Sequence, residues 1–165
     1  MKMELIQPFV SAMDAVLAET TQCAPVIADL TMQEEGYRRK GTAALIAIRG
    51  EIDGRVILDM EGATAARIAS LLSGADVEES ESLVRETVCE LANMVIGNAV
   101  TLLNDRGFRF KVLPPEVYTV EQCEKEGMDS EAMLLSFQVP AGTVFMNISM
   151  RYLRRRNRER ASAVA

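Results

Sequence analysis

Residues 80–106, with the sequence SESLVRETVCELANMVIGNAVTLLNDR, carry the longest helical pattern in the chain. Ser80 is a residue type that caps helices, acidic residues follow it in the first turn, and Gly107 comes directly after the segment. One side of this helix is apolar and consists of Val84, Val88, Leu91, Val95, Ala99 and Leu102. The segment therefore predicts a long, two-faced helix that lays its Leu91 side on the protein core.

Four positions on the opposite side form what we call the polar stripe: Glu86, Glu90, Asn93 and Gly97. Their spacings of four, three and four residues place them within an arc of about 60°, at roughly 100° per residue. An ordinary exposed helix face carries Lys and Glu pairs at four-residue spacing, whereas this one offers two carboxylates, a carboxamide and a glycine. The polar stripe predicts a docking edge, and a solvated helix face is the alternative.

The composition is that of one soluble globular domain. The chain has 165 residues, of which 48% are hydrophobic and 25% charged, so it can bury most of its apolar surface in a single core. No run approaches the roughly 20 apolar residues that a membrane-spanning helix needs. The N-terminus leads into an amphipathic helix instead of the apolar block of a signal peptide. We therefore expect a cytoplasmic protein with no membrane partner.

The residue inventory limits the chemistry that the chain can perform. It contains no histidine, which excludes serine–histidine triad hydrolases and HExxH metalloproteases. Cys23, Cys89 and Cys123 are widely spaced and form no CxxC pair, so neither a zinc site nor a disulfide framework is expected. Any catalysis must depend on carboxylates, amides or groups supplied by a partner.

Basic residues are concentrated at the C-terminus. Residues 151–160 contain six arginines and one glutamate, whereas the net charge of the whole chain is −6. A nucleic-acid-binding domain needs a basic face on its folded body, and this body is acidic, so no nucleic-acid partner is expected. We predict one domain over residues 1–153 and a basic, disordered, solubilising tail over 154–165. A tail that binds nucleic acid or anionic lipid is the alternative.

Two further helices are predicted, one on each side of a group of strands. Pro8 is expected in the first turn of a helix that runs to about Thr21. Residues 61–73, closed by Gly74, have the pattern of a short helix.

Strands account for most of the remaining sequence. The β-favouring runs are residues 25–32, 42–49, 55–60, 108–112, 117–120, 133–139 and 143–150. Asp53-Gly54 is typical of a hairpin turn, and Pro114-Pro115 ends a strand. This order of elements predicts an α+β fold, a two-layer sandwich of long helices packed on a largely antiparallel β-sheet.

Residues 88–99, VCELANMVIGNA, closely resemble the signature helix of the CheX family of chemotaxis phosphatases, which are relatives of CheC and FliY. The resemblance covers roughly residues 8–150 and includes Pro114-Pro115. The chain departs from the family pattern at Glu86, where the family has Asp or Ser, and in a slightly shorter segment between Asn93 and Pro114. Relatives similar to CheC carry a second motif on the first helix. That helix has no Asn here, so one site per chain is expected.

The resemblance implies a CheC/CheX-like fold and hydrolysis of the aspartyl phosphate on a CheY-like response regulator. Asn93 would orient the attacking water and Glu90 would pair with the lysine of the regulator, while Glu86 and Gly97 would contact the partner. This chain would bind no metal or other cofactor itself, because Mg²⁺ would be held by the regulator. The resemblance also implies a homodimer joined through sheet edges, for which the strand containing Phe145 is a candidate.

Alternatives remain for each part of this interpretation. A non-catalytic adaptor, either response-regulator-binding or similar to a flagellar-switch module, would use the same helix only for binding. Glu86 is either a second docking carboxylate or an ordinary surface charge. Gly97 reflects either close packing of a neighbouring helix or access for a partner. A phosphatase is favoured, since a simple binding surface has no need for an amide three residues after a carboxylate.

Overall fold

The computed structural model describes residues 3–33, 36–118 and 131–152. Within these residues the helices are α1 (Met3–Thr21), α2 (Gly62–Ser73) and α3 (Glu81–Asp105). The strands are β1 (Val26–Gln33), β2 (Thr42–Gly50), β3 (Ile52–Met60), β4 (Phe110–Val112), β5 (Glu116–Val117), β6 (Ala132–Val139) and β7 (Gly142–Tyr152). The predicted tail over 154–165 and Cys123 lie outside the described residues.

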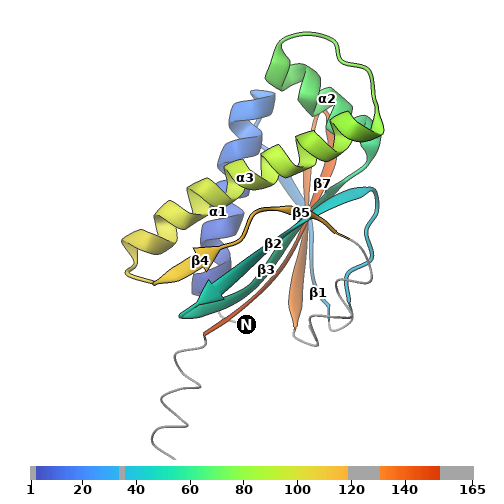
Figure 1. Ribbon diagram of the computed structural model, residues 1–165. Helices are drawn as coiled ribbons and strands as arrows, with labels where there is room; N and C mark the ends of the chain where they lie inside the picture. The colour runs from blue at the N-terminus through green and yellow to red at the C-terminus, as the bar shows by residue number, and fades with distance from the viewer. Residues whose placement is uncertain (1–2, 34–35, 119–130, 153–165) are drawn as a thin grey trace, which may run out of the picture.

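The strands form one antiparallel sheet in the described part of the chain. Its order is β1-β6-β7-β3-β2-β4, and β5 pairs with another part of β2, at Ala44 and Leu45. Figure 1 shows the sheet nearly edge-on, with the helices beside it. β6 and β7 make the predicted C-terminal hairpin, in which Val139 pairs with Gly142. The predicted α+β class and the antiparallel sheet are confirmed.

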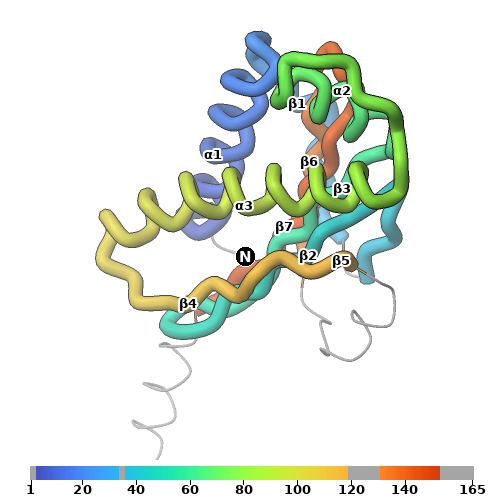
Figure 2. Tube along the Cα trace, turned by 45° about the horizontal axis from the view of Figure 1, so that its top comes forward, coloured from blue at the N-terminus to red at the C-terminus, as the bar shows by residue number. Residues whose placement is uncertain are grey.

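All three helices lie on the same face of the sheet (Figures 1 and 2). The main core lies between these two layers and includes Phe9 of α1, Ile68 of α2, Leu91 of α3 and Ile148 of β7, none of which is exposed. Because successive side chains of a strand point to opposite faces of the sheet, Ala43, Leu45 and Ile57 lie on the face away from the helices. The predicted two-layer arrangement is therefore confirmed. No helix in the described ranges is long and apolar enough to cross a membrane.

The face away from the helices carries a smaller cluster that includes Tyr37, Ile57 and Tyr118. The fully buried Asp59 holds it together, because its carboxylate accepts hydrogen bonds from the Tyr37 hydroxyl at 2.6 Å and from the Lys40 amide at 2.5 Å. Burial, reinforced by the hydrogen bond to this carboxylate, raises the pKa of Tyr37. The Tyr37 hydroxyl is therefore uncharged. The cluster lies on the face of the sheet opposite to α3.

Pro8 does not lie in the first turn of its helix, as the sequence predicts, but inside α1. A proline at this position has no N–H to donate to the carbonyl oxygen of Glu4 four residues earlier. Arg106, at the end of α3, donates to that oxygen from Nη1 at 2.6 Å. The proline is therefore tolerated because a side chain from another helix replaces the missing hydrogen bond.

The prediction of a hairpin turn at Asp53-Gly54 is also wrong, since the β2–β3 turn lies at Gly50 and Glu51. Gly54 lies within β3, opposite Met150 of β7, with a φ of 157°. A Cβ atom at this position would lie 2.0 Å from the carbonyl oxygen of Ser149. The glycine is required by the close approach of β7 and not by a turn.

The predicted dimer edge is wrong as well. Phe145, and with it Met146 and Ile148, belongs to β7, which is paired on both sides, with β3 and with β6. Among the strands of the described residues, β1 has a free edge, because it pairs there only with β6. β1 exposes apolar side chains, including Val26, Ile27, Leu30 and Met32, and Leu30 is 54% exposed.

Candidate functional site

The helix α3 is fixed at both ends and along its apolar side. Ser80 is its N-cap, and the Ser80 hydroxyl accepts a hydrogen bond from the amide of Leu83 at 3.1 Å. Val88, Leu91 and Val95 are buried against the sheet layer. In both views α3 crosses in front of α1 (Figures 1 and 2). The predicted long helix and its buried Leu91 side are confirmed.

The predicted apolar side is wrong only near the C-terminus of α3. Leu102 is 40% exposed, whereas Leu103 is fully buried. α1 packs against α3, and Ile96 and Ala99 of α3 are buried too. The buried side near the end of the helix therefore includes Leu103 in place of Leu102.

All four residues of the polar stripe are exposed on α3. The structure describes no hydrogen bond or ion pair for the side chains of Glu86, Glu90 and Asn93 within residues 3–33, 36–118 and 131–152. The nearest basic residue along the helix, Arg85, is paired with Glu81 at 2.7 Å, one turn away. The stripe therefore presents two carboxylates and one carboxamide that are free to contact another molecule.

At Gly97, near the C-terminal end of the polar stripe, the space beside the helix is empty. An ideal Cβ atom on Gly97 would meet no atom of its surroundings within 4 Å. Close packing of a neighbouring helix, one of the two explanations for this glycine, is therefore wrong for the described residues. Access for a partner remains the prediction.

Two buried residues hold the central pair of the stripe in place. Leu91 and Ala92 lie between Glu90 and Asn93 in sequence and are 0% and 2% exposed. Because the backbone between these two side chains is anchored in the core, their spacing of one helical turn is fixed by packing. Sites built on such an element hold their geometry better than sites on loops.

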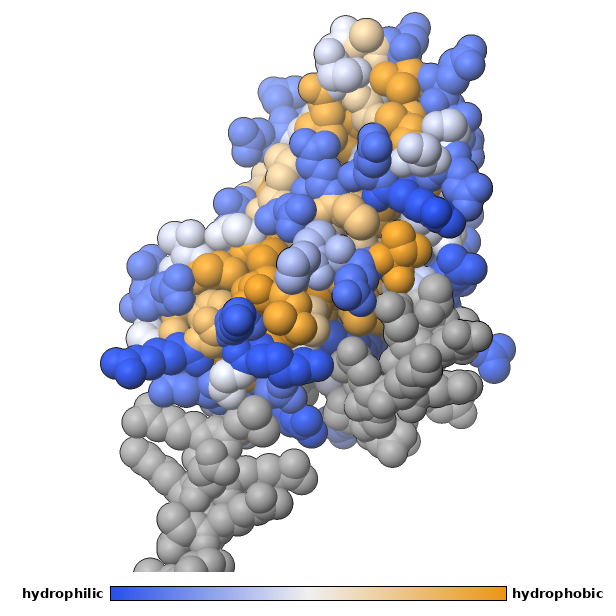
Figure 3. Space-filling view, viewed as in Figure 1, coloured by the Kyte–Doolittle hydropathy of each residue, from blue (hydrophilic) through white to orange (hydrophobic). Residues whose placement is uncertain are grey.

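Hydrophobic side chains gather on the surface between α3 and β4 (Figure 3). They include Val100, Phe110 and Val112, which are partly buried against the main core. Cys89 of α3 is also half-buried, and burial raises the pKa of its thiol. That thiol packs as a small group against the main core.

Acidic side chains do not gather into a metal site in the ranges that the structure covers. No group of three or more Asp, Glu, Cys or His side chains among the described residues is arranged to hold a metal ion. Glu86 and Glu90 are separated by one helical turn and are followed by a neutral amide. Divalent cations that prefer oxygen need several such ligands in one shell.

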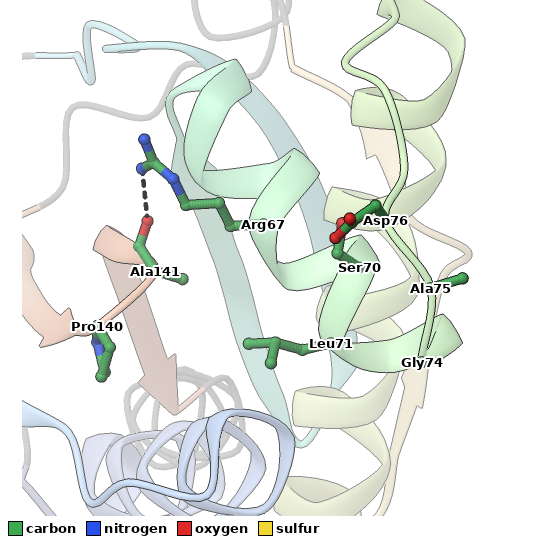
Figure 4. A pocket seen from close by; sticks show the side chains of 8 residues that line it. All are labelled: Arg67, Ser70, Leu71, Gly74, Ala75, Asp76, Pro140 and Ala141. Atoms are coloured by element: carbon green, nitrogen blue, oxygen red, sulfur yellow. Dashed lines mark hydrogen bonds between the residues drawn. The ribbon is translucent and has the colours of Figure 1, made fainter.

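A shallow hollow of about 720 Å³ lies between α2 and the β6–β7 turn (Figure 4). Leu71 and Pro140 form its walls, and Arg67 at its edge donates from Nη1 to the carbonyl oxygen of Ala141 at 3.0 Å. None of the polar-stripe residues lines this hollow. It is therefore distinct from the candidate site on α3.

Residues 42–138 match the protein family described as chemotaxis phosphatase CheX. The chain belongs to the CheX family. The matched region contains all of α3 and so the whole polar stripe. The predicted membership of the CheX family is confirmed. Among curated proteins, none matches the chain.

Solved structures with the same fold include several members of this group. A CheC-like superfamily protein from Shewanella sp. PV-4 superposes with a TM-score of 0.77 and 21% identity, over 92% of this chain and 99% of that one. CheX from Vibrio vulnificus gives a TM-score of 0.73 and 21% identity, over 90% and 99% of the two chains. These likenesses confirm the predicted CheC/CheX-like fold.

A third structure is the complex of CheX, CheY, BeF₃ and Mg²⁺ from Borrelia burgdorferi. Its matching chain has a TM-score of 0.68 and 27% identity, over 88% of this CheX-family chain and 97% of that chain. In that complex a CheX protein is bound to a CheY protein together with Mg²⁺.

Proposed function

We propose that this CheX-family chain hydrolyses the aspartyl phosphate of a CheY-like response regulator. The observation that carries the proposal is an exposed carboxylate and an exposed carboxamide, Glu90 and Asn93, one turn apart on a helix anchored in the core. The Borrelia complex supports the class of partner, since CheX is bound there to CheY with BeF₃ and Mg²⁺.

Asn93 acts on the attacking water in this proposal. Its amide has both donor and acceptor atoms, so it can hold a water molecule in line with the bond between phosphorus and the aspartyl oxygen. The water oxygen forms a bond to phosphorus, the aspartate carboxylate leaves, and the proton of the water passes to the released phosphate. Positioning of this kind is the main contribution a protein makes to phosphoryl transfer.

Glu90 fixes how deep the helix enters the site of the regulator. Its carboxylate pairs with the lysine in the active site of the regulator, a charge-assisted contact with a defined distance. Glu86 supplies a second acidic contact one turn before Glu90, and Gly97 leaves space for the partner backbone one turn after Asn93. Because the residues lie along one rigid helix, docking at Glu90 also places Asn93.

The direct experiment is phosphate release from a phosphorylated CheY-like protein, with and without this chain. The expected result is faster release that depends on the concentration of the chain and saturates. Unchanged release together with tight binding would instead assign the non-catalytic adaptor role. The regulator alone, with its own slow hydrolysis, serves as the baseline.

We predict that the reaction requires Mg²⁺ but that this chain alone does not bind it tightly. Glu86 and Glu90, with a neutral amide nearby, make a poor shell for a hard divalent cation. Calorimetric titration of Mg²⁺ into the isolated chain should give no binding heat at millimolar concentration. A micromolar site that disappears in Glu90→Gln would show an autonomous metal-dependent enzyme and contradict the insertion mechanism.

We also propose that the chain forms a homodimer through the free edge of β1. An exposed strand edge with apolar side chains favours pairing with a second strand. Sedimentation at tens of micromolar should give twice the mass of the chain, and Leu30→Lys should shift the protein to monomer. Leu71→Lys changes a similarly exposed leucine on α2 and should leave the dimer intact. A wild-type monomer under these conditions would refute the proposal.

A further inference from the structure

A narrow groove lies between α2 and α3, directly beside the polar stripe. Its volume is about 250 Å³. The lining residues with apolar or small side chains are Ala69, Leu72, Ser73, Val77, Leu83 and Thr87. Glu86 and Glu90, the first two residues of the polar stripe, form the remaining part of the lining.

The interior of the groove offers apolar contact, because its polar groups already have partners. The Thr87 hydroxyl donates to the carbonyl oxygen of Leu83 at 2.8 Å, and the Ser73 hydroxyl donates to that of Ala75 at 3.1 Å. Leu72 contributes a large apolar side chain that is still 39% exposed. The charges on the lining belong to the two glutamates.

The groove is held open by the backbone around it. Gly74 ends α2 in a left-handed conformation with a φ of 73°, and its amide donates to the carbonyl oxygen of Ser70 at 3.0 Å. The amide of Val77 donates to the Ser70 hydroxyl at 3.0 Å, so the loop after α2 is tied to that helix. An apolar group can therefore enter the groove without first ordering the loop.

The size and position of the groove identify what fits it. Pockets for small-molecule ligands usually have volumes of about 300–1,000 Å³, and this one is smaller but has room for a large apolar side chain. Its acidic part favours a basic neighbour on the occupant. Because Glu86 and Glu90 belong to both surfaces, a protein that contacts Glu90 and Asn93 also covers the groove.

We infer that the α2–α3 groove receives one apolar side chain of the response regulator, beside a basic residue that pairs with Glu86. The inference rests on the proposed function, since it assumes that the same regulator docks on Glu90. The groove contact adds affinity but touches no reacting atom. It therefore selects among regulators, while Asn93 acts on whichever regulator is bound.

The test compares two neighbouring leucines of α2 in the full chain. Leu72→Gln removes an apolar wall of the groove, whereas Leu71→Gln changes a leucine that is 50% exposed and lines the other hollow (Figure 4). The Kd for a beryllofluoride-activated CheY-like protein should rise about tenfold in Leu72→Gln and less than about twofold in Leu71→Gln. Val77→Thr, which keeps the shape of the side chain, should raise the Kd about threefold. Thermal unfolding of each variant checks that the fold is kept.

The outcomes separate this inference from the proposed function. A raised Kd and KM in Leu72→Gln with an unchanged kcat supports the groove contact. Equal affinities for wild type, Leu72→Gln and Leu71→Gln, with the wild type active, overturn the groove contact alone. Absence of both binding and hydrolysis in the wild type overturns the proposed function and the groove contact together.

Discussion

Asn93→Ala is expected to abolish accelerated phosphate release, lowering the catalysed rate by at least about 100-fold. The Kd for the activated regulator should change by less than about threefold, because the amide holds a water molecule and contributes little contact area. The measurement is a phosphate-release time course at saturating chain, together with a binding titration. Loss of kcat with retained affinity is the signature of a group that acts only on the reaction.

Asn98→Ala is the matched control for this prediction. Asn98 is the same residue type on the same helix and is exposed, but it lies about 120° from the polar stripe at roughly 100° per residue. Its substitution changes helix propensity in the same way and should leave hydrolysis unchanged. Wild-type activity in Asn93→Ala would remove the proposed mechanism, while equal losses in both variants would point to damage of α3 itself.

The long helix and its stripe are predictable from sequence because they depend on one local period. The capping Ser80, the buried Leu91 and the exposed Glu90 and Asn93 all follow from the positions of residues within a single segment. The resemblance to the family signature then gives these positions an expected role in a reaction. Neither step requires knowledge of which elements lie next to one another.

The errors arise where a distant segment decides the local structure. Gly54 is required by the close backbone of β7, which is far away in sequence. The local pattern at Asp53-Gly54 therefore cannot distinguish a turn from a close approach of a paired strand. Pro8 is tolerated inside α1 because Arg106 comes from another helix. Leu103 is buried in place of the predicted Leu102 on α3, a helix that packs against α1.

For the same reason, the sequence does not predict the exposed edge of β1 or the α2–α3 groove. β7 lies inside the sheet between β6 and β3, and β1 lies at its edge. This arrangement depends on strand order and not on strand propensity. Leu72 is an ordinary member of an apolar helix pattern in sequence. Only the placement of α2 beside α3 shows that it faces a groove at the stripe.

Glu90→Lys is expected to weaken both binding and hydrolysis. The substitution replaces a charge-assisted contact by a repulsion at the same point, which costs about 3 kcal/mol, or roughly a 100-fold rise in Kd. Glu90→Ala removes the attraction without adding the repulsion and should have a smaller effect in the same direction. Binding titrations at low and high ionic strength should show that the penalty of Glu90→Lys decreases as salt screens the charges.

Glu86→Ala provides the comparison on the same stripe. Glu86 lies one turn earlier, where it can contact the regulator only beside the groove, so its loss should cost severalfold in Kd at most. A larger effect at Glu86 than at Glu90 would place the lysine of the regulator one turn from the proposed position. Asn93 would then lie about 10 Å along the helix from the point of docking instead of about 5 Å, too far for the amide to reach the attacking water. The relative size of the two effects therefore tests the register in which α3 enters the regulator.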